Sequence, residues 1–372
     1  MRIGIPKEIK NHEYRVGLTP GSVRELVAHG HQVLVQQDAG SAIGLTDELY
    51  RQAGATVLPD AAEVFAVAEL IVKVKEPQPE EMPLLQPRHT LFTYLHLAPD
   101  PEQTTGLLAS GATAIAYETV TSPGGGLPLL APMSEVAGRM SIQAGAHCLE
   151  KSQGGAGLLL GGVPGVAPAR VLILGGGVVG SNAARMAAGL EAEVTIIDQS
   201  LERLRQLDAQ FGNRVHTQYA TTDAIERAAL RSDLIVGAVL VPGAAAPKLI
   251  ERELLRQLKP GTVLVDVSID QGGCFATSRP TTHAAPTYVL DGIVHYCVAN
   301  MPGAVARTST FALNNATLPF VLELADRGPI AALRSNPYLR HGLNVHRGRL
   351  TCAPAAAALG LPFVAAETAL SI

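Results

Sequence analysis

Three glycines spaced as G-x-G-x-x-G, namely Gly175, Gly177 and Gly180, are the residues whose types and spacing indicate chemistry most specifically. They follow a short apolar run at 171–174 and open a helix-compatible run at 178–190. Gly175 would permit a tight turn, Gly177 would let a pyrophosphate approach the backbone, and Gly180 would let the helix pack closely on the strand. The first N–H groups of such a helix attract phosphate.

An acid follows the glycines at the distance that a dinucleotide site requires. A second apolar run, 194–197, ends at Asp198, 18 residues after Gly180. A carboxylate there can accept hydrogen bonds from the adenosine ribose and would repel a 2′-phosphate. We therefore expect NAD rather than NADP, and we expect Arg203 and Arg205 to face outward on the next helix. A glycine-rich turn in an unrelated protein is the alternative, but the order of strand, glycines, helix, strand and acid favours the dinucleotide site.

Cationic side chains in the first hundred residues have the chemistry to hold a carboxylate. Arg15 lies in a loop that starts a helix, and its planar guanidinium can bind a carboxylate through two hydrogen bonds. A surface arginine is the alternative. Lys73 and Lys75 alternate in the run 70–77, so they would share one face of a strand. Spacing alone leaves an anion site and solvated lysines at a strand end equally open.

Two further residues offer proton transfer at the ends of predicted strands. His96 ends the apolar run 91–96, and histidine titrates near neutral pH. A hydrogen-bonded core histidine is the alternative. Asp270 ends the run 263–270, where an acid could orient a histidine or hold a nicotinamide ribose. Asp266 in the same run is interpreted as a buried structural acid.

Alternating strands and helices must position these residues. In the first third we predict strands at 2–5, 32–36, 69–75 and 90–95 and helices at 22–29 and 47–53. This alternation is typical of a parallel sheet with helices on its faces. The turn-rich segment 121–128 is the best domain boundary, and a long helix at 131–151 would connect the domains.

The second half of the chain predicts another sheet of the same kind. Strands are expected at 171–174, 194–197, 214–218, 233–240, 263–269 and 293–298, with helices at 178–190, 200–210, 223–230 and 251–258. From residue 307 the pattern is helical, at 310–327 and 330–335, and this segment is expected to return to the first domain. We predict an α/β protein with two doubly wound, Rossmann-like domains separated by a cleft and joined by the long helix. Residues 1–128 with 307–372 would form the substrate domain, and 129–306 the NAD-binding domain.

Composition excludes several classes of protein. The 372 residues suffice for about two domains, and 47% hydrophobic against 17% charged residues suits large buried sheets. A net charge of −4 argues against nucleic-acid or acidic membrane partners. No apolar run reaches the ~18 residues of a membrane span, and a strand rather than a basic, apolar leader opens the chain. Four scattered cysteines without a zinc motif fit buried thiols in a reducing cytosol, so we expect a cytoplasmic protein without a metal site.

These motifs together resemble the alanine dehydrogenase / transhydrogenase family almost from end to end. The resemblance is carried by GIPKEIK at 4–10, RVGLTP at 15–20, KVKEP at 73–77, YLHLAP at 94–99, PMSEVAG at 132–138, GGGVVG at 175–180, DVSIDQGG at 266–273 and NMPGAV at 300–305. Several unlinked motifs in one order are far more specific than the glycine loop alone.

The resemblance implies a role for each motif. Arg15 and Lys75 would hold a substrate carboxylate, with Asn300 near the substrate. His96 would transfer protons, and Asp270 would be the second catalytic residue. Cofactor contacts are implied at Ser134, Gly175, Gly177, Val178, Val179, Gly180, Asp198, Arg203, Val239, Leu240, Val267, Asp270 and Met301.

The implied activity is the NAD-dependent, reversible oxidative deamination of L-alanine to pyruvate and ammonia, by hydride transfer, in a homohexamer. Its partners would be L-alanine, pyruvate and ammonium, without nucleic acid or membrane. The alternatives are the nucleotide-binding module of a proton-translocating transhydrogenase, a saccharopine- or lysine-type dehydrogenase, and a catalytically silent NAD sensor. The presence of Arg15, Lys75 and His96 together favours the dehydrogenase, because a module that passes hydride between two nucleotides needs no site for an amino-acid carboxylate. NADH formation with alanine, lysine or saccharopine would separate these possibilities.

Overall fold

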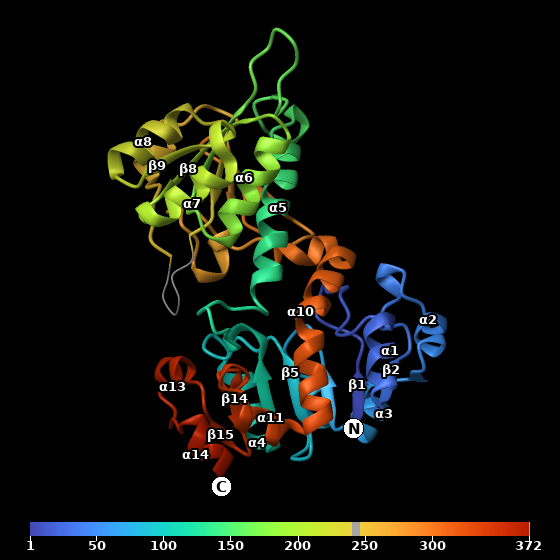
Figure 1. The fold of residues 1–372 in the computed structure, drawn as a ribbon. Coiled ribbons are helices and arrows are strands. Elements are labelled where there is room, and N and C mark those ends of the chain that lie inside the picture. Colours follow the sequence, from blue (N-terminus) through green and yellow to red (C-terminus); the bar gives the residue numbers. More distant parts are fainter. Residues whose placement is uncertain (240–245, 372) are drawn as a thin grey trace. The chain divides into compact units, whose positions relative to one another are not determined.

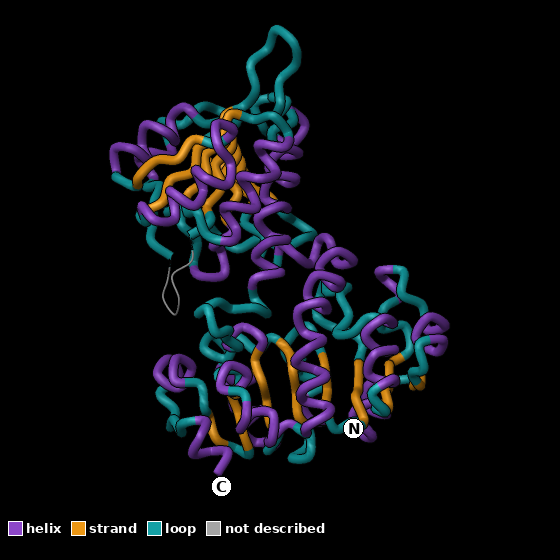
Figure 2. Tube along the Cα trace, in the orientation of Figure 1, coloured by secondary structure: helices purple, strands orange, loops and turns teal. Residues whose placement is uncertain are grey.

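The structure, a computed structural model, describes residues 1–239 and 246–371 (Figure 1). The chain divides into two compact units. Met1–Met133 together with Val305–Ile372 form the first, here called unit 1, and Ser134–Ala304 form unit 2. Each unit contains one sheet with helices packed against it, as Figure 2 shows, so the predicted α/β class with two Rossmann-like folds is confirmed.

The sheet of unit 1 has eight strands. They are β1 Arg2–Ile5, β2 Gln32–Gln36, β3 Thr56–Leu58, β4 Leu70–Val72, β5 Thr90–Thr93, β6 Thr113–Ala116, β14 Leu343–His346 and β15 Arg349–Leu350. Their order is β15-β14-β6-β5-β4-β1-β2-β3. Strands β1 to β6 are parallel and have the doubly wound order, and β14 and β15 extend the sheet in antiparallel pairing. Every residue of β4, β5 and β6 is buried, as in a sheet covered on both faces.

The sheet of unit 2 repeats this plan. Its strands are β7 Arg170–Leu174, β8 Glu193–Asp198, β9 His216–Tyr219, β10 Leu234–Gly237, β11 Val263–Asp266, β12 Thr287–Leu290 and β13 Ile293–Tyr296. Their order is β12-β13-β11-β10-β7-β8-β9, in which β12 is an antiparallel edge strand and the others are parallel. The strand order reverses between the neighbouring strands β7 and β10, and this topological switch point is where such folds bind ligands.

Helices connect the parallel strands in both units. Unit 1 contains α1 Pro20–Ala28, α2 Asp47–Gln52, α3 Ala61–Val67, α4 Pro101–Ser110, α10 Ala306–Arg327, α11 Pro329–Ser335, α12 Pro337–Arg340, α13 Ala353–Leu359 and α14 Ala366–Ser371. Unit 2 contains α6 Val178–Gly189, α7 Leu201–Phe211, α8 Thr222–Arg231 and α9 Arg252–Leu255, and α5 Ala131–Cys148 has residues in both units. Among the described helices, none is both long and apolar enough to cross a membrane.

Several predicted strands are shorter in the structure, and this moves the candidate site residues into loops. The strands predicted at 69–75 and 90–95 end at Val72 and Thr93. The strand predicted at 263–269 ends at Asp266, because the Asp266 side chain accepts the N–H of Ser268 and starts a 3-10 helix, η6 Val267–Gln271. The strand predicted at 233–240 ends at Gly237, and residue 240 lies outside the described residues.

Other elements have no counterpart in the prediction. Strands β3, β6 and β12 and helices α3 and α4 are additional, and the segment after residue 307, predicted only as helices, also supplies β14 and β15. Most of these elements are short, so their apolar pattern is too brief to separate strand from helix.

The core of unit 2 lies between the central strands and two helices. Leu172, Ile235 and Leu264, from three neighbouring strands, belong to one buried cluster with Ile225 of α8 and Leu255 of α9. This cluster fixes α8 against the middle of the sheet.

Candidate active site

Arg15 lies in the loop between β1 and α1 and is held by Glu13. Arg15 is only 2% exposed, and its Nε and Nη2 donate to the two carboxylate oxygens of Glu13 at 2.7 and 2.6 Å. Burial would raise the pKa of Glu13, but the hydrogen bonds and charge of Arg15 outweigh it and lower that pKa to about 2. Nη1 of Arg15 lies 3.1 Å from Met133 Sδ, a weak acceptor.

Lys73 and Lys75 differ sharply in their surroundings. Lys73 is fully buried, and its Nζ donates to Glu8 at 3.1 Å and to Glu81 at 2.8 Å. Lys75 is partly buried and forms no ion pair with any of the described residues. The expectation that the two lysines share one face of a strand is wrong, because β4 ends at Val72 and both lie beyond it.

The surroundings of the Lys75 ammonium disfavour its positive charge, and this favours the binding of an anion. Burial lowers the pKa of Lys75, and the charges of Arg15 and Lys10 lower it further, against the opposite effect of Glu76. Arg15 is thus close enough to Lys75 for its charge to disfavour the ammonium. A carboxylate placed next to this ammonium would offset its charge.

His96 follows β5 in a loop rather than ending the strand as predicted. Its backbone is left-handed, with φ +50°, and its ring stacks on Tyr94 with centroids 5.8 Å apart and planes 9° apart. Glu118 Oε1 accepts the backbone N–H of His96 at 2.6 Å and lies 3.9 Å from His96 Nδ1. Tyr94 in turn donates to the carbonyl of Leu129 at 2.6 Å. The imidazole is exposed, so the core-histidine alternative does not describe it.

In unit 1, Arg15 influences the pKa values of both Lys75 and Tyr94, and His96 stacks on the ring of Tyr94. Sequence reasoning missed Glu13 and Glu118, the two acids that hold this group. Glu13 lies two residues from Arg15 in the same loop, which is the only signal that the sequence offered; Glu118 is 22 residues from His96.

The glycine loop of unit 2 has the geometry that its spacing predicts. Gly175 has φ +99°, and an added Cβ would lie 2.6 Å from the carbonyl oxygen of Ala238. At Gly180 the Cβ would lie 1.8 Å from the Gly175 oxygen, so the helix packs against the loop itself. At Gly177 it would meet none of the described atoms within 4 Å. Gly175 and Gly180 therefore require glycine for packing, whereas Gly177 leaves open space above the backbone.

Asp198 and Arg203 hold the middle of this loop from two sides. Asp198 Oδ2 accepts the N–H of Gly176 at 2.7 Å, and its Oδ1 accepts that of Ser200 at 2.8 Å. Arg203 Nε donates to the Gly176 carbonyl at 2.6 Å. The expectation that Arg203 faces outward is therefore wrong: the helix that begins at Leu201 turns this side chain back over the loop. Arg205 is exposed, as expected.

The loop and the start of α6 fit the pyrophosphate of a dinucleotide. Gly177 is the N-cap of α6 and offers no side-chain acceptor to the first N–H groups. Val178 is 43% exposed, and Val179 is partly exposed. An uncapped helix N-terminus beside an open glycine is a favourable environment for phosphate oxygens.

The other residues assigned to the cofactor lie on neighbouring loops of unit 2. Val239 follows β10, and its carbonyl accepts the hydroxyl of Ser268 at 2.7 Å, which ties this loop to η6. Val267 and Asp270 lie within η6, and Asp270 is exposed. Leu240 lies outside the described residues.

Asp266 organises the loop that carries Asp270. It is fully buried, and it accepts the N–H groups of Ser268 at 3.0 Å and Cys274 at 2.9 Å and the hydroxyl of Ser278 at 2.5 Å. Burial raises the pKa of Asp266 against these hydrogen bonds. This geometry agrees with the interpretation of Asp266 as a structural acid.

The remaining predicted residues lie near the limits of unit 2. Ser134 is in the first turns of α5 and is partly buried. Asn300 has φ +61° and precedes the 3-10 helix η7 Met301–Val305, whose first residue, Met301, is buried. His283 Nε2 is 3.1 Å from the carbonyl oxygen of Asn300. Asp270 and Asn300 thus belong to a different unit from Arg15 and Lys75.

Comparisons with known proteins agree along the whole chain. The family model described as Alanine dehydrogenase/PNT, N-terminal domain matches residues 4–137, and the corresponding C-terminal domain model matches residues 141–353. The chain is 64% identical to the alanine dehydrogenase of Halomonas elongata, with 99% of each chain covered. It is 54% identical to that of Bacillus subtilis, with 100% of this chain and 98% of the relative covered.

Solved structures give the same result. An L-alanine dehydrogenase superimposes with a TM-score of 0.94 at 53% identity, covering 97% of this chain and 99% of the other. A transhydrogenase from Sinorhizobium meliloti superimposes with a TM-score of 0.82 at 21% identity, covering 94% and 100% of the two chains. At that identity the second match concerns the fold alone.

Proposed function

The chain belongs to the alanine dehydrogenase/PNT family, and from this premise we propose that it catalyses the reversible oxidative deamination of L-alanine to pyruvate and ammonia with NAD as the hydride acceptor. Relatives that are 64% and 54% identical to this chain carry the name alanine dehydrogenase. Residue roles, cofactor identity, assembly and location are parts of the same proposal.

The observation that carries the proposal is the charge balance around Lys75. Glu8 and Glu81 neutralise Lys73, and Glu13 binds Arg15, whereas Lys75 forms no ion pair with the described residues. A partly buried ammonium without an ion-pair partner is costly unless a ligand supplies one. The carboxylate of alanine or pyruvate supplies that charge, and Arg15 adds a second contact.

Each of the candidate residues of unit 1 then has a role in the reaction. Arg15 and Lys75 bind the carboxylate and orient the α-carbon. A base removes a proton from the ammonium group, because a protonated amine has no lone pair to assist loss of hydride. Water adds to the resulting iminium carbon, His96 carries protons to and from this centre, and ammonia leaves as pyruvate forms. Asp270 is proposed as the second catalytic residue.

A nicotinamide cofactor, when bound, accepts the hydride that leaves the α-carbon. We assign its pyrophosphate to the glycine loop with Val178 and Val179, and its adenosine ribose to Asp198 beside Arg203. Further contacts are proposed at Ser134, Val239, Leu240, Val267, Asp270 and Met301, with Asn300 near the substrate. The uncapped start of α6 and the open space at Gly177 support this assignment.

The residues of unit 1 also bear on the alternative of a transhydrogenase module. Such a module transfers hydride between two nucleotides and has no use for a cationic site that lacks a carboxylate. The unpaired Lys75 beside Arg15 therefore favours the dehydrogenase.

We propose a homohexamer located in the cytoplasm, with L-alanine, pyruvate and ammonium as its small-molecule partners. The four cysteines are free, which suits a reducing compartment. Light scattering at micromolar concentration tests the assembly, and a monomer mass would contradict it.

The test of function is NADH formation followed at 340 nm with L-alanine, and in parallel with L-lysine and saccharopine. We expect turnover with alanine alone, and the reverse reaction with pyruvate and ammonium. Activity only with lysine or saccharopine, or cofactor binding without turnover of any of the three, would contradict the proposal.

A further inference from the structure

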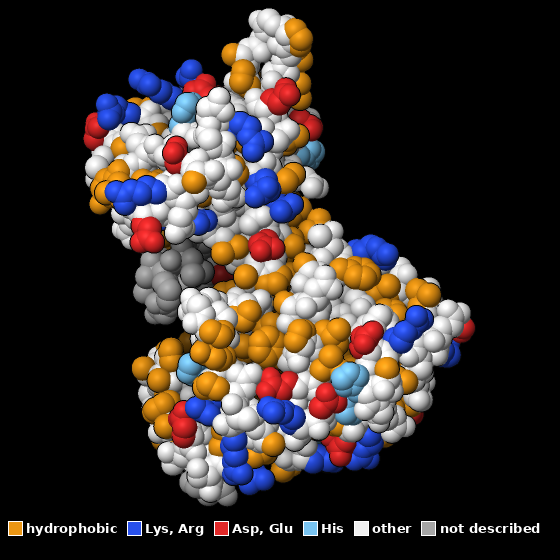
Figure 3. Space-filling model, viewed as in Figure 1, with side chains coloured by type: hydrophobic (Ala, Val, Ile, Leu, Met, Phe, Trp, Pro, Cys, Tyr) orange, Lys and Arg blue, Asp and Glu red, His pale blue; other side chains and the backbone are white. Residues whose placement is uncertain are grey.

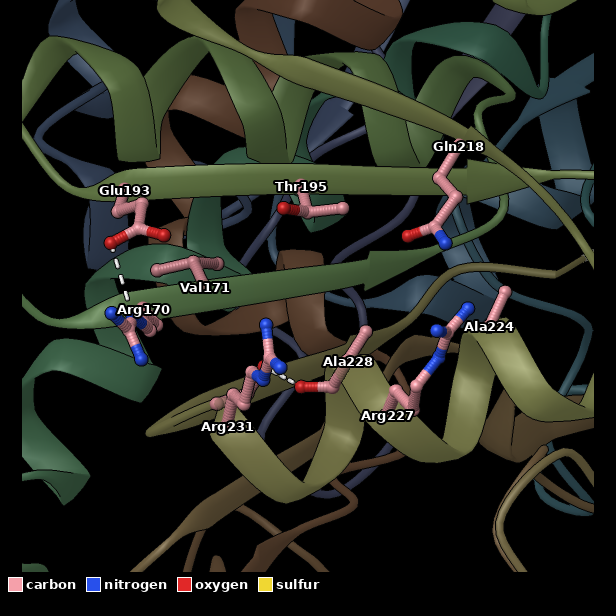
Figure 4. Close-up of a pocket in the computed structure, with 10 residues that line it drawn as sticks. Arg170, Val171, Glu193, Thr195, Gln218, Ala224, Arg227, Ala228 and Arg231 are labelled. Carbon is pink, nitrogen blue, oxygen red and sulfur yellow. Dashed lines mark hydrogen bonds and ion pairs between the residues drawn. The ribbon is translucent and has the colours of Figure 1, made fainter.

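A polar groove lies between α8 and the sheet of unit 2, away from the glycine loop (Figure 4). Its volume is about 350 Å³, within the range of sites that hold small metabolites. Figure 4 shows strand residues on one side and the side chains of α8 on the other, with the groove between them.

The groove is a consequence of topology. The chain steps from β7 to β8 to β9 in one direction and returns through α8 to β10. Because parallel crossovers are right-handed, this reversal places α8 on the opposite face of the sheet from α6 and α7. One helix must then cover three strands. Ile225 of α8 and Ile197 of β8 share a buried cluster, whereas Glu193 and Thr195, on the same face of β8, line the groove.

The strand side of the groove is polar where a doubly wound sheet is normally apolar. Thr195 and Gln218 line the groove, and the structure gives neither the hydroxyl of Thr195 nor the amide of Gln218 a hydrogen-bond partner among the described residues. In Figure 4 the amide of Gln218 points toward the side chain of Arg227. Two unused polar groups of this kind provide donors for a polar ligand.

The charged residues that line the groove determine whether it attracts an anion or a cation. Three arginines line it against one acid: Arg170, Arg227 and Arg231 against Glu193. Arg170 pairs with Glu193 at 3.0 Å. Arg231 forms no ion pair within the described part of the chain.

Arg227 is also available for a ligand. It pairs with Asp223 at 2.7 Å, but the two side chains are 64% and 71% exposed, and such a pair contributes little stability. Figure 3 shows Lys and Arg side chains, with Asp and Glu side chains among them, over the region of unit 2 that α7 and α8 occupy in Figure 1. The groove therefore combines an excess of guanidinium groups with unpaired polar neighbours.

We propose that this groove is a second anion-binding site, for a small ligand carrying two or more phosphate or carboxylate groups. Guanidinium forks bind both groups through paired hydrogen bonds. Arg227 and Arg231 are four positions apart on α8 and both line the groove, so they can hold one ligand together, and Arg170 of β7 lines the same groove.

The site is distinct from the proposed dinucleotide site. Arg170 and Glu193 are the first residues of β7 and β8, whereas Gly175 and Asp198 lie at the opposite ends of these strands. Five strand residues span roughly 17 Å at about 3.3 Å each. A ligand in the groove would therefore not displace NADH.

The test uses the full chain with NADH at saturation, so that the glycine loop is occupied. NADH binding is measured first, and its failure would concern the cofactor assignment alone. Inorganic pyrophosphate is then titrated by calorimetry at constant ionic strength, with citrate in a parallel arm that distinguishes a phosphate from a carboxylate ligand. We expect saturable binding of at least one of these probes.

Three substitutions test the proposal, and for each we expect a stated change in the affinity for the probe. Arg231→Gln should weaken binding by about tenfold, as the loss of one charge-assisted contact predicts. Glu193→Gln should strengthen binding, because it removes the only acid of the groove and releases Arg170. Arg185→Gln, an exposed arginine on α6, is the matched control and should have no effect. Absence of binding by both probes, equal weakening by Arg231→Gln and Arg185→Gln, or weakening by Glu193→Gln would overturn the proposal.

Discussion

Glu13 binds Arg15 through both carboxylate oxygens, at 2.7 Å to Nε and 2.6 Å to Nη2, although only one residue separates them in the chain. The pair is almost completely buried. It fixes the plane of the guanidinium and commits that edge to Glu13. If Arg15 binds the substrate carboxylate as proposed, Glu13 also sets the direction from which that carboxylate can approach.

Glu13→Gln is expected to raise the KM for alanine and pyruvate by about tenfold, since one buried charge-assisted contact no longer orients Arg15. The change in kcat should be smaller, because Glu13 acts through Arg15 and not on the reacting atoms. Breaking a buried pair should also lower the free energy of unfolding by about 3 kcal/mol. Steady-state kinetics and urea unfolding measure both effects. Glu48→Gln, which removes an exposed acid that lies 3.8 Å from Arg51, is the control, and an unchanged KM in Glu13→Gln would refute the positioning role.

Lys75→Ala and Lys73→Ala should have opposite profiles. Lys75→Ala removes the unpaired ammonium, so KM for alanine and pyruvate should rise by tenfold or more while stability is nearly unchanged. Lys73→Ala leaves Glu8 and Glu81 buried without a counter-charge and should cost about 3–5 kcal/mol of unfolding free energy. Spacing alone did not separate the two lysines, and the complete burial of Lys73 makes its substitution the more costly one for stability. Greater destabilisation by Lys75→Ala than by Lys73→Ala would contradict this account.

His96→Ala should lower kcat by ~10²–10⁴-fold, the usual contribution of a general acid–base group. NADH binding should persist, because the glycine loop belongs to the other unit. Stopped-flow or steady-state rates and NADH fluorescence separate the two effects. His147→Ala removes another exposed histidine, one that lies 3.2 Å from Glu150, and should leave both unchanged. Near-normal turnover of folded His96→Ala would remove this histidine from the mechanism.

The unmodified protein should prefer NAD to NADP by about 2 kcal/mol or more, roughly 30-fold, from repulsion between Asp198 and a 2′-phosphate. Asp198→Ala should narrow this ratio, and it should also weaken NAD binding, because it frees the N–H of Gly176. Arg203 beside the loop adds a cation that would then attract a 2′-phosphate. The ratio of kcat/KM for the two cofactors is the measurement, with Asp208→Ala on the exposed side of α7 as control. Equal use of both cofactors by the unmodified protein would refute the role of Asp198.

His89 should make stability depend on pH below neutrality. Its Nδ1 accepts the N–H of Gln86 at 3.0 Å, and its Nε2 lies 2.9 Å from the carbonyl of Phe65, so only the neutral ring satisfies both. Burial, with Arg88 adding, lowers the pKa of His89 from 6.5 to about 4. The unfolded chain therefore binds a proton that the folded chain does not between these values. Stability is complete above pH 6.5 and declines as pH falls toward 4.

The measurement is the free energy of unfolding in urea at pH 7 and pH 5. His89→Gln should lower stability at pH 7 but should lose less on going to pH 5 than the unmodified protein does. An equal loss in both proteins would show that other groups cause the pH dependence.

Local patterns were sufficient to predict most of the architecture. Strands β1 and β2 and the strand–helix–strand segment from β7 to β8 were predicted from apolar runs and glycines that lie close together in the chain. The roles of Gly175 and Gly180 were predicted from their spacing. Strand ends were harder, because a single side chain, as with Asp266 and η6, can stop a strand that the apolar pattern would continue.

The sequence by itself determined which residue types are available for binding and catalysis. These are a glycine loop, an acid at the distance from that loop that a dinucleotide site requires, and two cations with a histidine. Only the tertiary structure decided which charges are satisfied. Spacing does not separate Lys73 from Lys75, yet Glu8, 65 residues before Lys73, pairs with Lys73, whereas Lys75 has no ion pair among the described residues. Arg203 likewise turns inward because the Gly176 carbonyl is there to accept it. Periodicity is a local property of the chain, whereas the partner of a charged group is set by folding, which brings distant segments within hydrogen-bonding distance.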